Sequence, residues 1–323
     1  MDFNNADVMR AQVALRMVAI QHLFDPVRGI ELIDIGRLER DGRQYDQLAI
    51  RCHVTQKLPD VHLESIGRTP LQELKPTLGF PLMVMEGAYY PQSSWPWVAR
   101  QPSSQASRSD PLHGGVSIGT ARAGSGTLGG IVRDRRTRQP MLLSNWHVIV
   151  GGWGNLHGQP IYQPSRDDGG TVADIVATLE RDGMSFQLDA AVATLNKRRR
   201  WSNEQMGIPG PVPGVAVAGI GMQVEKSGRT SGITRGVVTG VGGIQRLQYA
   251  GIERVLRNVF TIEPRRASEE VSRGGDSGSW WLESTTKKAV GVHFAGSDQP
   301  ERALALDMQS VLDALDVDVM TTL

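Results

Sequence analysis

Short apolar runs separated by glycine dominate the chain from residue 115 onward, and this pattern limits the fold more than any other feature. Such runs occur at residues 125–132, 141–143, 171–179, 190–195, 215–219 and 236–241. Several short strands at this spacing are typical of a β-barrel. The 37 glycines and 17 prolines among 323 residues also fit a turn-rich β protein better than a helical one. We therefore predict a mainly β fold, closed by a helix over residues 307–315.

The first 90 residues have a different pattern, which predicts a small α+β module. Residues 6–23 carry a wide apolar face at helical spacing, and Asp25-Pro26 would end that helix. Strands are expected at residues 30–35 and 47–54, with a hairpin turn at residues 40–43, and within residues 72–87. A module of this length can form a core, although a marginal one.

Serine and proline are frequent in residues 91–114, and this composition predicts a linker or an exposed loop. Trp95 and Trp97 would anchor the linker on the domain that follows. A second interpretation is that the segment is one that a protease cuts in itself. The predicted organisation is therefore a module at residues 1–90, a linker at residues 91–114 and a β domain at residues 115–323.

Charge and composition exclude several classes of partner. The net charge of +1 gives no reason to expect nucleic acid or an anionic membrane, and the basic run at residues 197–200 fits a solvated loop. The sequence contains no run of about 18 apolar residues, so we do not expect a membrane span. The single cysteine, Cys52, allows no intramolecular disulfide. The first residues lack the pattern of a signal peptide, so we expect a cytoplasmic protein.

Neither a metal nor a nucleotide is expected as a cofactor. Histidine and cysteine are too sparse at the spacing of metal ligands. The glycine-rich stretch at residues 240–243 lacks the lysine and the serine of a phosphate-binding loop.

The stretch Gly274-Gly275-Asp276-Ser277-Gly278-Ser279 could build a nucleophile and an oxyanion hole in one turn. Glycines let the backbone turn tightly, so that successive N–H groups point to one side. The N–H groups of Gly275 and Ser277 could then stabilise the charge that develops on a carbonyl oxygen during acyl transfer. Ser279 is the weaker nucleophile candidate, because the glycine pair precedes Ser277. Taken alone, the motif also fits a plain turn between strands.

Two other stretches supply a base and a carboxylate. An apolar strand at residues 142–143 leads to His147, whose type of side chain can accept a proton near neutral pH. Asp189 stands at the head of the small apolar run 190–195, and a carboxylate that enters a core needs a partner such as an imidazolium. Asp174 and Asp182 are rivals for this role. The order along the chain is His147, Asp189, Ser277.

Order, spacing and local motifs resemble the trypsin-like, or chymotrypsin-fold, serine proteases. More narrowly, they resemble bacterial peptidases related to the plant narrow-leaf proteases. The stretches that carry this resemblance are residues 126–130, 143–148, 189–195, 228–236 and 289–297. The resemblance covers roughly residues 115–320. It implies two six-stranded β-barrels with the active site between them, with His147 and Asp189 on the first barrel and Ser277 on the second.

The resemblance also implies roles and a reaction. Ser277 would be the nucleophile of an acyl-enzyme mechanism, His147 its general base, and Asp189 the group that orients His147. The substrate would be a protein or peptide, and a homo-oligomer is allowed. The rival hypothesis is a protease-fold module that binds peptides without turnover.

Substrate preference follows from the same resemblance. Ser272, His293 and Gly296 map onto the pocket for the residue that precedes the scissile bond. Val271 stands where trypsin-type enzymes carry an aspartate, which argues against cleavage after Lys or Arg. A histidine at position 293 beside a hydroxyl at position 272 resembles glutamate-specific bacterial endopeptidases. A small residue at the cleavage site and a purely structural His293 are the alternatives.

Activation departs from the trypsin pattern. No Arg or Lys followed by Ile-Val-Gly-Gly precedes the first expected barrel, so nothing supplies an obvious new N-terminus for Asp276 to bind. The sequence favours an enzyme that is active as made, or one that is regulated by the N-terminal module or by assembly.

Overall fold

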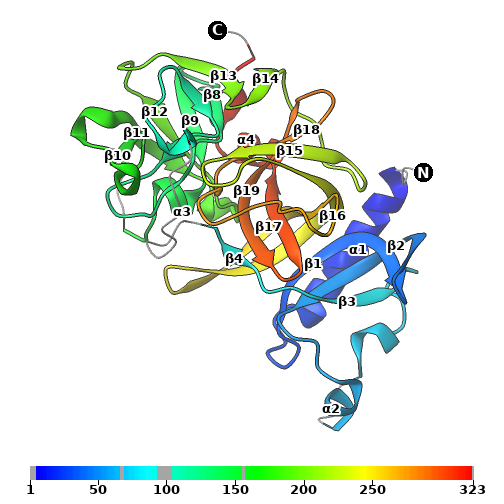
Figure 1. The fold of residues 1–323 in the computed structure, drawn as a ribbon. Helices are drawn as coiled ribbons and strands as arrows, with labels where there is room; N and C mark the ends of the chain where they lie inside the picture. Colours follow the sequence, from blue (N-terminus) through cyan, green and yellow to red (C-terminus); the bar gives the residue numbers. More distant parts are fainter. Residues whose placement is uncertain (1–4, 66–68, 93–103, 155–156, 322–323) are drawn as a thin grey trace.

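The computed structural model describes residues 5–65, 69–92, 104–154 and 157–321, and they form a mainly β protein (Figure 1). The predicted fold class, mainly β with a small α+β part at the N-terminus, is confirmed. The structure has three parts (Figure 1). They are a first unit of small and large sheets between residues 112 and 211, a barrel formed by β15 to β20, and the N-terminal module beside that barrel.

The second half of the chain forms a closed barrel of six strands. They are β15 (Gln223–Gly228), β16 (Gly232–Tyr249), β17 (Ile252–Pro264), β18 (Trp280–Glu283), β19 (Ala289–Asp298) and β20 (Glu301–Asp307). The strand order is β15-β18-β19-β20-β17-β16, and β15 also pairs with β16, which closes the ring. β19 is buried along nearly its whole length, and it carries His293 and Gly296.

The preceding part of the chain forms the other large sheet, called the first sheet below, which has six strands. Its order is β10 (Pro160–Tyr162), β11 (Ile175–Asp182), β12 (Ala191–Leu195), β9 (Pro140–Ser144), β8 (Gly130–Asp134) and β21 (Val317–Val319). Smaller sheets lie beside it, formed by β5 (Leu112–Gly114) with β13 (Trp201–Gln205) and β14 (Ile208–Pro211), and by β6 (Ser117–Ile118) with β7 (Gly126–Thr127). After α4 (Met308–Ala314), strand β21 returns to the first sheet and pairs with β8.

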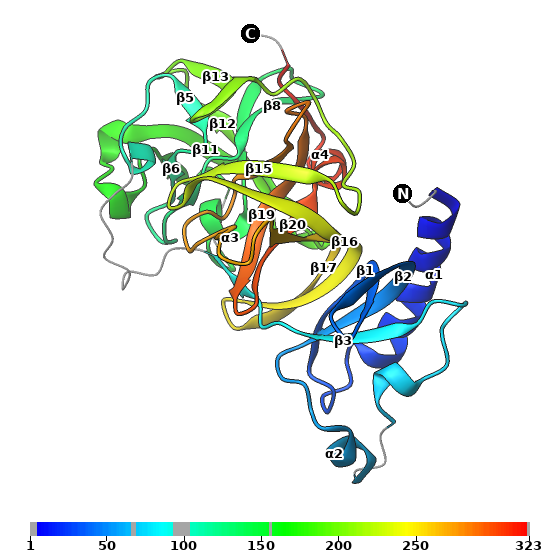
Figure 2. The same ribbon diagram turned by 45° about the vertical axis from the view of Figure 1, so that its right-hand side comes forward.

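The N-terminal module continues the sheet of the second barrel. It consists of α1 (Asn5–His22), β1 (Ile30–Arg40), β2 (Arg43–Val54), the short α2 (Asp60–Ser65) and β3 (Leu82–Glu86). β1 pairs with β16 in antiparallel register, with Leu32 opposite Gln245. Leu15 and Val18 of α1 belong to the same hydrophobic core as Phe260 of the barrel. Figure 2 shows α1 lying across one face of the β1–β2–β3 layer.

A buried ion pair fixes this junction. Arg51 in β2 donates to both oxygens of Asp34 in β1, at 2.6 and 2.5 Å. Thr261 of β17 donates to the same carboxylate at 2.7 Å, so the network joins the module to the barrel. The ion pair needs a glycine at position 240 in β16, because a Cβ there would lie 1.9 Å from both Arg51 Nη2 and Asp34 Oδ2. Burial raises the pKa of Asp34, but Arg51 and His53 outweigh it and hold the pKa far below its usual range.

The predicted helix, the hairpin and the strand before residue 87 are confirmed. The boundary at residue 90 stays a prediction, although the sheet and the core both run across it. Most of the expected linker, including Trp95 and Trp97, lies outside the described residues. Its last part is ordered: Gln105 is buried, and β5 pairs with β13. Among the described residues, no helix is long and apolar enough to cross a membrane.

Candidate active site

The turn that carries Ser277 depends on glycine. Gly275 and Gly278 both have a φ of 99°, a conformation that L side chains rarely adopt. A Cβ on Gly278 would lie 2.2 Å from Ser144 Oγ and from Thr127 O, so only glycine allows this close approach to the first sheet. Thr127 N donates to Ser277 O at 2.7 Å. The turn is therefore pressed against the end of the strand that leads to His147.

Asp276 holds the turn from behind. Its carboxylate is fully buried and accepts a 2.8 Å ion pair from Lys226 of β15. The backbone N–H groups of Thr230, Ser231 and Arg273 also donate to it, at 2.9 to 3.0 Å. Burial alone would raise the pKa of Asp276, but Lys226 lowers it below the usual value. A lysine of the chain itself thus pairs with Asp276, for which the sequence supplied no obvious new N-terminus.

His147 and Asp189 meet as the sequence predicts. His147 Nδ1 lies 2.5 Å from Asp189 Oδ2, and His147 N donates to Asp189 Oδ1 at 3.0 Å. Asn145 Nδ2 donates to Asp189 O at 2.6 Å and fixes the backbone of the aspartate. Two contacts to one carboxylate set both the position and the orientation of the imidazole.

The local structure around His147 differs from the expected strand end. β9 ends at Ser144, and His147 lies on the one-turn helix α3 (Trp146–Ile149). The strand cannot continue because the backbone bonds of Val148 and Ile149 return to Asn145. The helical turn is what brings both His147 N and His147 Nδ1 to Asp189.

Ser277 lies near this pair, but the proton relay is not assembled. A Cβ on Gly126 would touch both Val148 of α3 and Ser277 O, so the helix and the turn both approach this glycine. Ser277 Oγ donates to Phe294 O at 3.2 Å. Within the described part of the chain, His147 Nε2 is buried without a hydrogen-bond partner. Hydrogen bonds of this kind are often long or misaligned without substrate and tighten only in the substrate complex.

A segment of the chain itself occupies the site. β4 (Tyr90–Pro91) pairs antiparallel with β19, with Pro91 opposite Ala295. Beyond it, Gln92 N donates to Phe294 O at 3.2 Å, and Gln92 O accepts from Gly275 N at 2.6 Å. One of the two N–H groups expected to form an oxyanion hole therefore binds a carbonyl oxygen in this structure.

Two of the three expected pocket residues contact the Gln92 side chain. His293 Nε2 lies 2.6 Å from Gln92 Oε1, and a Cβ on Gly296 would lie 2.3 Å from Gln92 Nε2. Ser272 is buried, and its Oγ lacks a partner among the described residues. Burial, with help from the charge of Lys226, lowers the pKa of His293 to about 3. The imidazole is thus neutral near pH 7, and its Nε2–H can donate to an amide oxygen.

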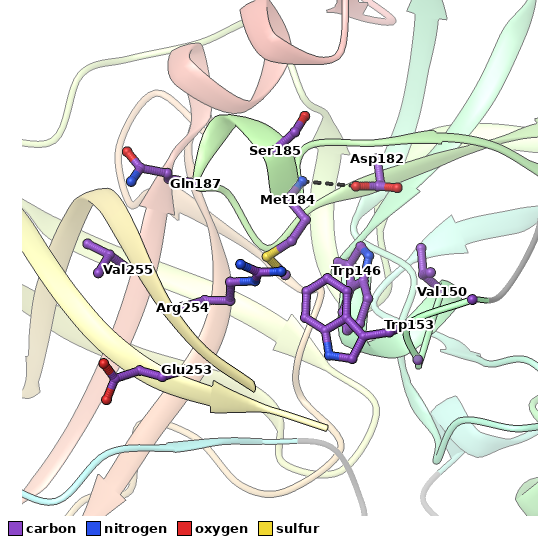
Figure 3. Close-up of a pocket in the computed structure, with 12 residues that line it drawn as sticks. Trp146, Val150, Trp153, Asp182, Met184, Ser185, Gln187, Glu253, Arg254 and Val255 are labelled. Atoms are coloured by element: carbon purple, nitrogen blue, oxygen red, sulfur yellow. Dashed lines mark hydrogen bonds between the residues drawn. The ribbon is translucent and has the colours of Figure 1, made fainter. Parts of the chain in front are cut away.

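A cavity of about 650 Å³ adjoins the histidine (Figure 3). Trp146 and Trp153 form one wall, and Met184 faces them from the loop before Asp189. The Arg254 guanidinium lies 4.4 Å from the ring centre of Trp153. The lining of this cavity mixes aromatic surface with charge, and it includes Trp146, the residue before His147.

Sequence reasoning missed three residues of this site. Tyr249 donates to Asp189 Oδ2 at 2.9 Å, but no motif surrounds it. Lys226 looks like an ordinary strand residue until the fold buries it, and Gln92 was included only within a linker. The rival carboxylates lie elsewhere: Asp174 pairs with Arg199 at 2.7 Å, and Asp182 accepts from Met184 N.

Comparisons with known proteins concern the fold. No protein family model and no curated protein matches the chain. The structure is similar to bacterial serine proteases. Thermobifida fusca protease A is similar over 66% of this chain and 100% of its own, with 18% identity and a TM-score of 0.48. A Nocardiopsis protease and a serine protease described as glutamic acid specific are each similar over 65% of this chain and 100% of theirs, with 19% identity and a TM-score of 0.49.

Proposed function

We propose that this protein is a serine endopeptidase that cuts peptide bonds through an acyl-enzyme. Ser277 would attack the carbonyl carbon, and His147 would take its proton and return it to the leaving amine. Asp189 would hold His147 in the tautomer whose Nε2 accepts that proton. The N–H groups of Gly275 and Ser277 would stabilise the oxyanion.

One observation carries the proposal: Gly275 N binds a carbonyl oxygen beside Ser277, in a turn that contacts Ser144, the last residue of the strand before His147. The distance from Gly275 N to this carbonyl oxygen is 2.6 Å, slightly shorter than the roughly 2.7–3.1 Å typical of an oxyanion-hole donor. The carbonyl belongs to Gln92. The N–H of Gln92 in turn donates to Phe294 O of β19. Peptide binding and acyl transfer are thus combined at one point.

A neutral His293 and the absence of an acidic residue at position 271 bear on specificity. The pocket contains a hydrogen-bond donor without a full charge, so it suits an amide or a protonated carboxyl better than Lys or Arg. The sequence predicts an acidic or small residue before the scissile bond, and the contact between His293 and the Gln92 amide makes glutamine a further candidate.

Intact-mass measurement after treatment with a fluorophosphonate tests the function. The full chain should gain one adduct at mildly alkaline pH, and the Gln92→Ala chain should gain it faster, because its pocket is open. Ser277→Ala should gain none. Ser279→Ala, whose hydroxyl only donates to Asp276 O, is the matched control and should still react. If neither the wild-type nor the Gln92→Ala chain reacts while both are folded, the peptide-binding module without turnover replaces this proposal.

A further inference from the structure

The segment at residues 90–92 lies in the site in the manner of a substrate. Its backbone pairs antiparallel with β19 through two positions, Tyr90 with Gly296 and Pro91 with Ala295. The extended pairing of a peptide with a sheet edge gives affinity through main-chain bonds, and pockets for alternate side chains give specificity. Solvent exposure falls along the segment: Tyr90 is exposed, Pro91 is half-buried and Gln92 is buried.

The carbonyl of Gln92 is the one that the catalytic turn binds. Gln92 O accepts from Gly275 N at 2.6 Å, while Gln92 N and Ser277 Oγ both donate to Phe294 O, each at 3.2 Å. Ser277 Oγ and Gln92 N therefore share Phe294 O as their acceptor. The Gln92 carbonyl oxygen accepts from Gly275 N, the expected oxyanion donor. The carbonyl group of Gln92 is thus fixed by hydrogen bonds beside Ser277, and such positioning favours attack by a nearby nucleophile.

The side chain of Gln92 fills the specificity pocket. Its amide oxygen lies 2.6 Å from His293 Nε2, and its amide nitrogen occupies the space left by the missing Cβ of Gly296. Gln92 is 8% exposed. A polar side chain this deeply buried needs a specific partner, and a neutral histidine supplies a donor that an amide oxygen satisfies.

We infer that residues 90–92 are the acyl half of an internal cleavage site, that the chain cuts itself after Gln92, and that the same pocket selects peptides with glutamine before the scissile bond. This inference rests on the proposed function. The alternative role for the same geometry is a tethered inhibitor that binds like a substrate and is not cut.

The reaction balances with water as the only co-reactant. Ser277 Oγ forms a bond to the Gln92 carbonyl carbon as His147 Nε2 takes the hydroxyl proton. The bond to the nitrogen of residue 93 then breaks, and that nitrogen takes the proton from His147. Water hydrolyses the ester between Gln92 and Ser277, which leaves a carboxylate on Gln92, a free amine on residue 93 and a restored hydroxyl.

Cleavage would not separate the two pieces. β1 stays paired with β16, and α1 stays in the core that it shares with Phe260. The new carboxylate would form on the main chain of Gln92, at Gly275 N beside Ser277, where a buried charge without a cationic partner is unfavourable. The cut end therefore leaves the pocket more readily than the intact segment does, and the site opens to other peptides.

Denaturing intact-mass analysis of the full chain during incubation tests the inference. The wild-type chain should split into residues 1–92 and 93–323, at a rate that is independent of protein concentration over a 100-fold range. Ser277→Ala should cut itself at least about 10³-fold more slowly. Gln92→Lys, which puts a charge against neutral His293, should slow the cut at least about tenfold.

A peptide supplied in trans separates failure of this inference from failure of the function. Tyr-Pro-Gln linked to a fluorogenic amine should be hydrolysed by the Gln92→Lys chain, and at least about tenfold faster than Tyr-Pro-Lys or Tyr-Pro-Glu at pH 8. If Gln92→Lys cleaves the peptide while the wild-type chain remains intact, the segment is an inhibitor and the internal cut is disproved. If Tyr-Pro-Gln has no advantage over Tyr-Pro-Glu, the glutamine preference is disproved. A chain that also fails to react with fluorophosphonate disproves the proposed function itself.

Discussion

Tyr249 Oη donates a 2.9 Å hydrogen bond to Asp189 Oδ2, the same oxygen that His147 Nδ1 contacts at 2.5 Å. Tyr249 ends β16 of the second barrel, whereas Asp189 precedes β12 of the other sheet. One phenol therefore connects the two halves of the molecule through the candidate triad. Burial, and next the charge of Asp189, raise the pKa of Tyr249 well above its usual value, so the phenol keeps its proton and remains a donor.

Tyr249→Phe should lower both activity and stability. A hydrogen bond to a buried charged group contributes about 1.5–3 kcal/mol, so the free energy of unfolding should fall by about that amount. We expect kcat/KM to fall about tenfold, because the carboxylate that orients His147 loses a partner. Urea unfolding and hydrolysis of a fluorogenic peptide measure the two effects. Tyr162→Phe, at a buried tyrosine of β10, is the control, and an equal loss of activity there would contradict the role of Tyr249.

Lys226→Met should disable the turn of Ser277. The change leaves the carboxylate of Asp276 buried without its cation, and breaking a buried ion pair in this way costs about 3–5 kcal/mol. Lys287→Met removes a lysine from a partly exposed pair with Glu225 and should cost no more than about 1 kcal/mol. The rate of fluorophosphonate labelling at Ser277 should fall in the first variant and stay unchanged in the second. Equal labelling rates in both would show that the pair does not support the nucleophile.

Stability should decrease in acid, and Asp34 should account for part of the decrease. The pKa values of Asp34 and Asp276 are lowered in the folded state, so their contribution is complete above about pH 4 and is lost as pH falls toward the lowered values. Burial also lowers the pKa values of His53 and His293. Their unfolded forms take up protons first, so the decrease in stability begins as pH falls through about 6.5.

Asp34→Asn tests this assignment. At pH 7 the variant should lose about 3–5 kcal/mol of unfolding free energy, because Arg51 keeps a buried charge without its partner. Between pH 5 and pH 3 its stability should change less than that of the wild-type chain. Urea midpoints at pH 7, 5 and 3 provide the comparison. Parallel pH curves for the two proteins would show that Asp34 does not titrate in this range.

Gly296→Ala should close the pocket without unfolding the protein. The new methyl group would lie 2.3 Å from the position of Gln92 Nε2 and 3.0 Å from Arg302 O. We expect turnover of a peptide with glutamine before the scissile bond to fall at least about tenfold, and turnover of one with alanine there to fall less. Gly291→Ala is an unsuitable control because its Cβ would meet Phe260, whereas Gly210→Ala has open space but a φ of 85°. Gly219→Ala, which has open space, serves best.

Local signals were sufficient for much of the fold and for the pairing of His147 with Asp189. The helix before Asp25, the hairpin at Asp41 and Gly42, and the short strands all follow from periodicity and turn residues. The continuity of the N-terminal module with the barrel could not be predicted. It depends on the register of β1 against β16, which two strands more than 200 residues apart in sequence do not reveal.

Long-range burial hid the other parts of the site. Lys226 and Tyr249 gain their roles only because the barrel closes around them and removes water from Asp276 and Asp189. Gln92 lies in a stretch whose composition indicates a linker, and only the pairing of β4 with β19 places it beside Ser277. Composition cannot distinguish an exposed segment from one that a neighbouring groove binds.

The path from β3 to β4 is short and fixed at several points. β3 ends at Glu86, whose carbonyl accepts from Arg302 Nη1 at 2.5 Å, and Tyr89 contacts His53 and Glu31 before β4 begins at Tyr90. A ligand held on so short a tether has an effective concentration of the order of millimolar or more. Any peptide supplied from solution must compete with it, so the apparent KM should be raised for as long as residues 90–92 occupy the site.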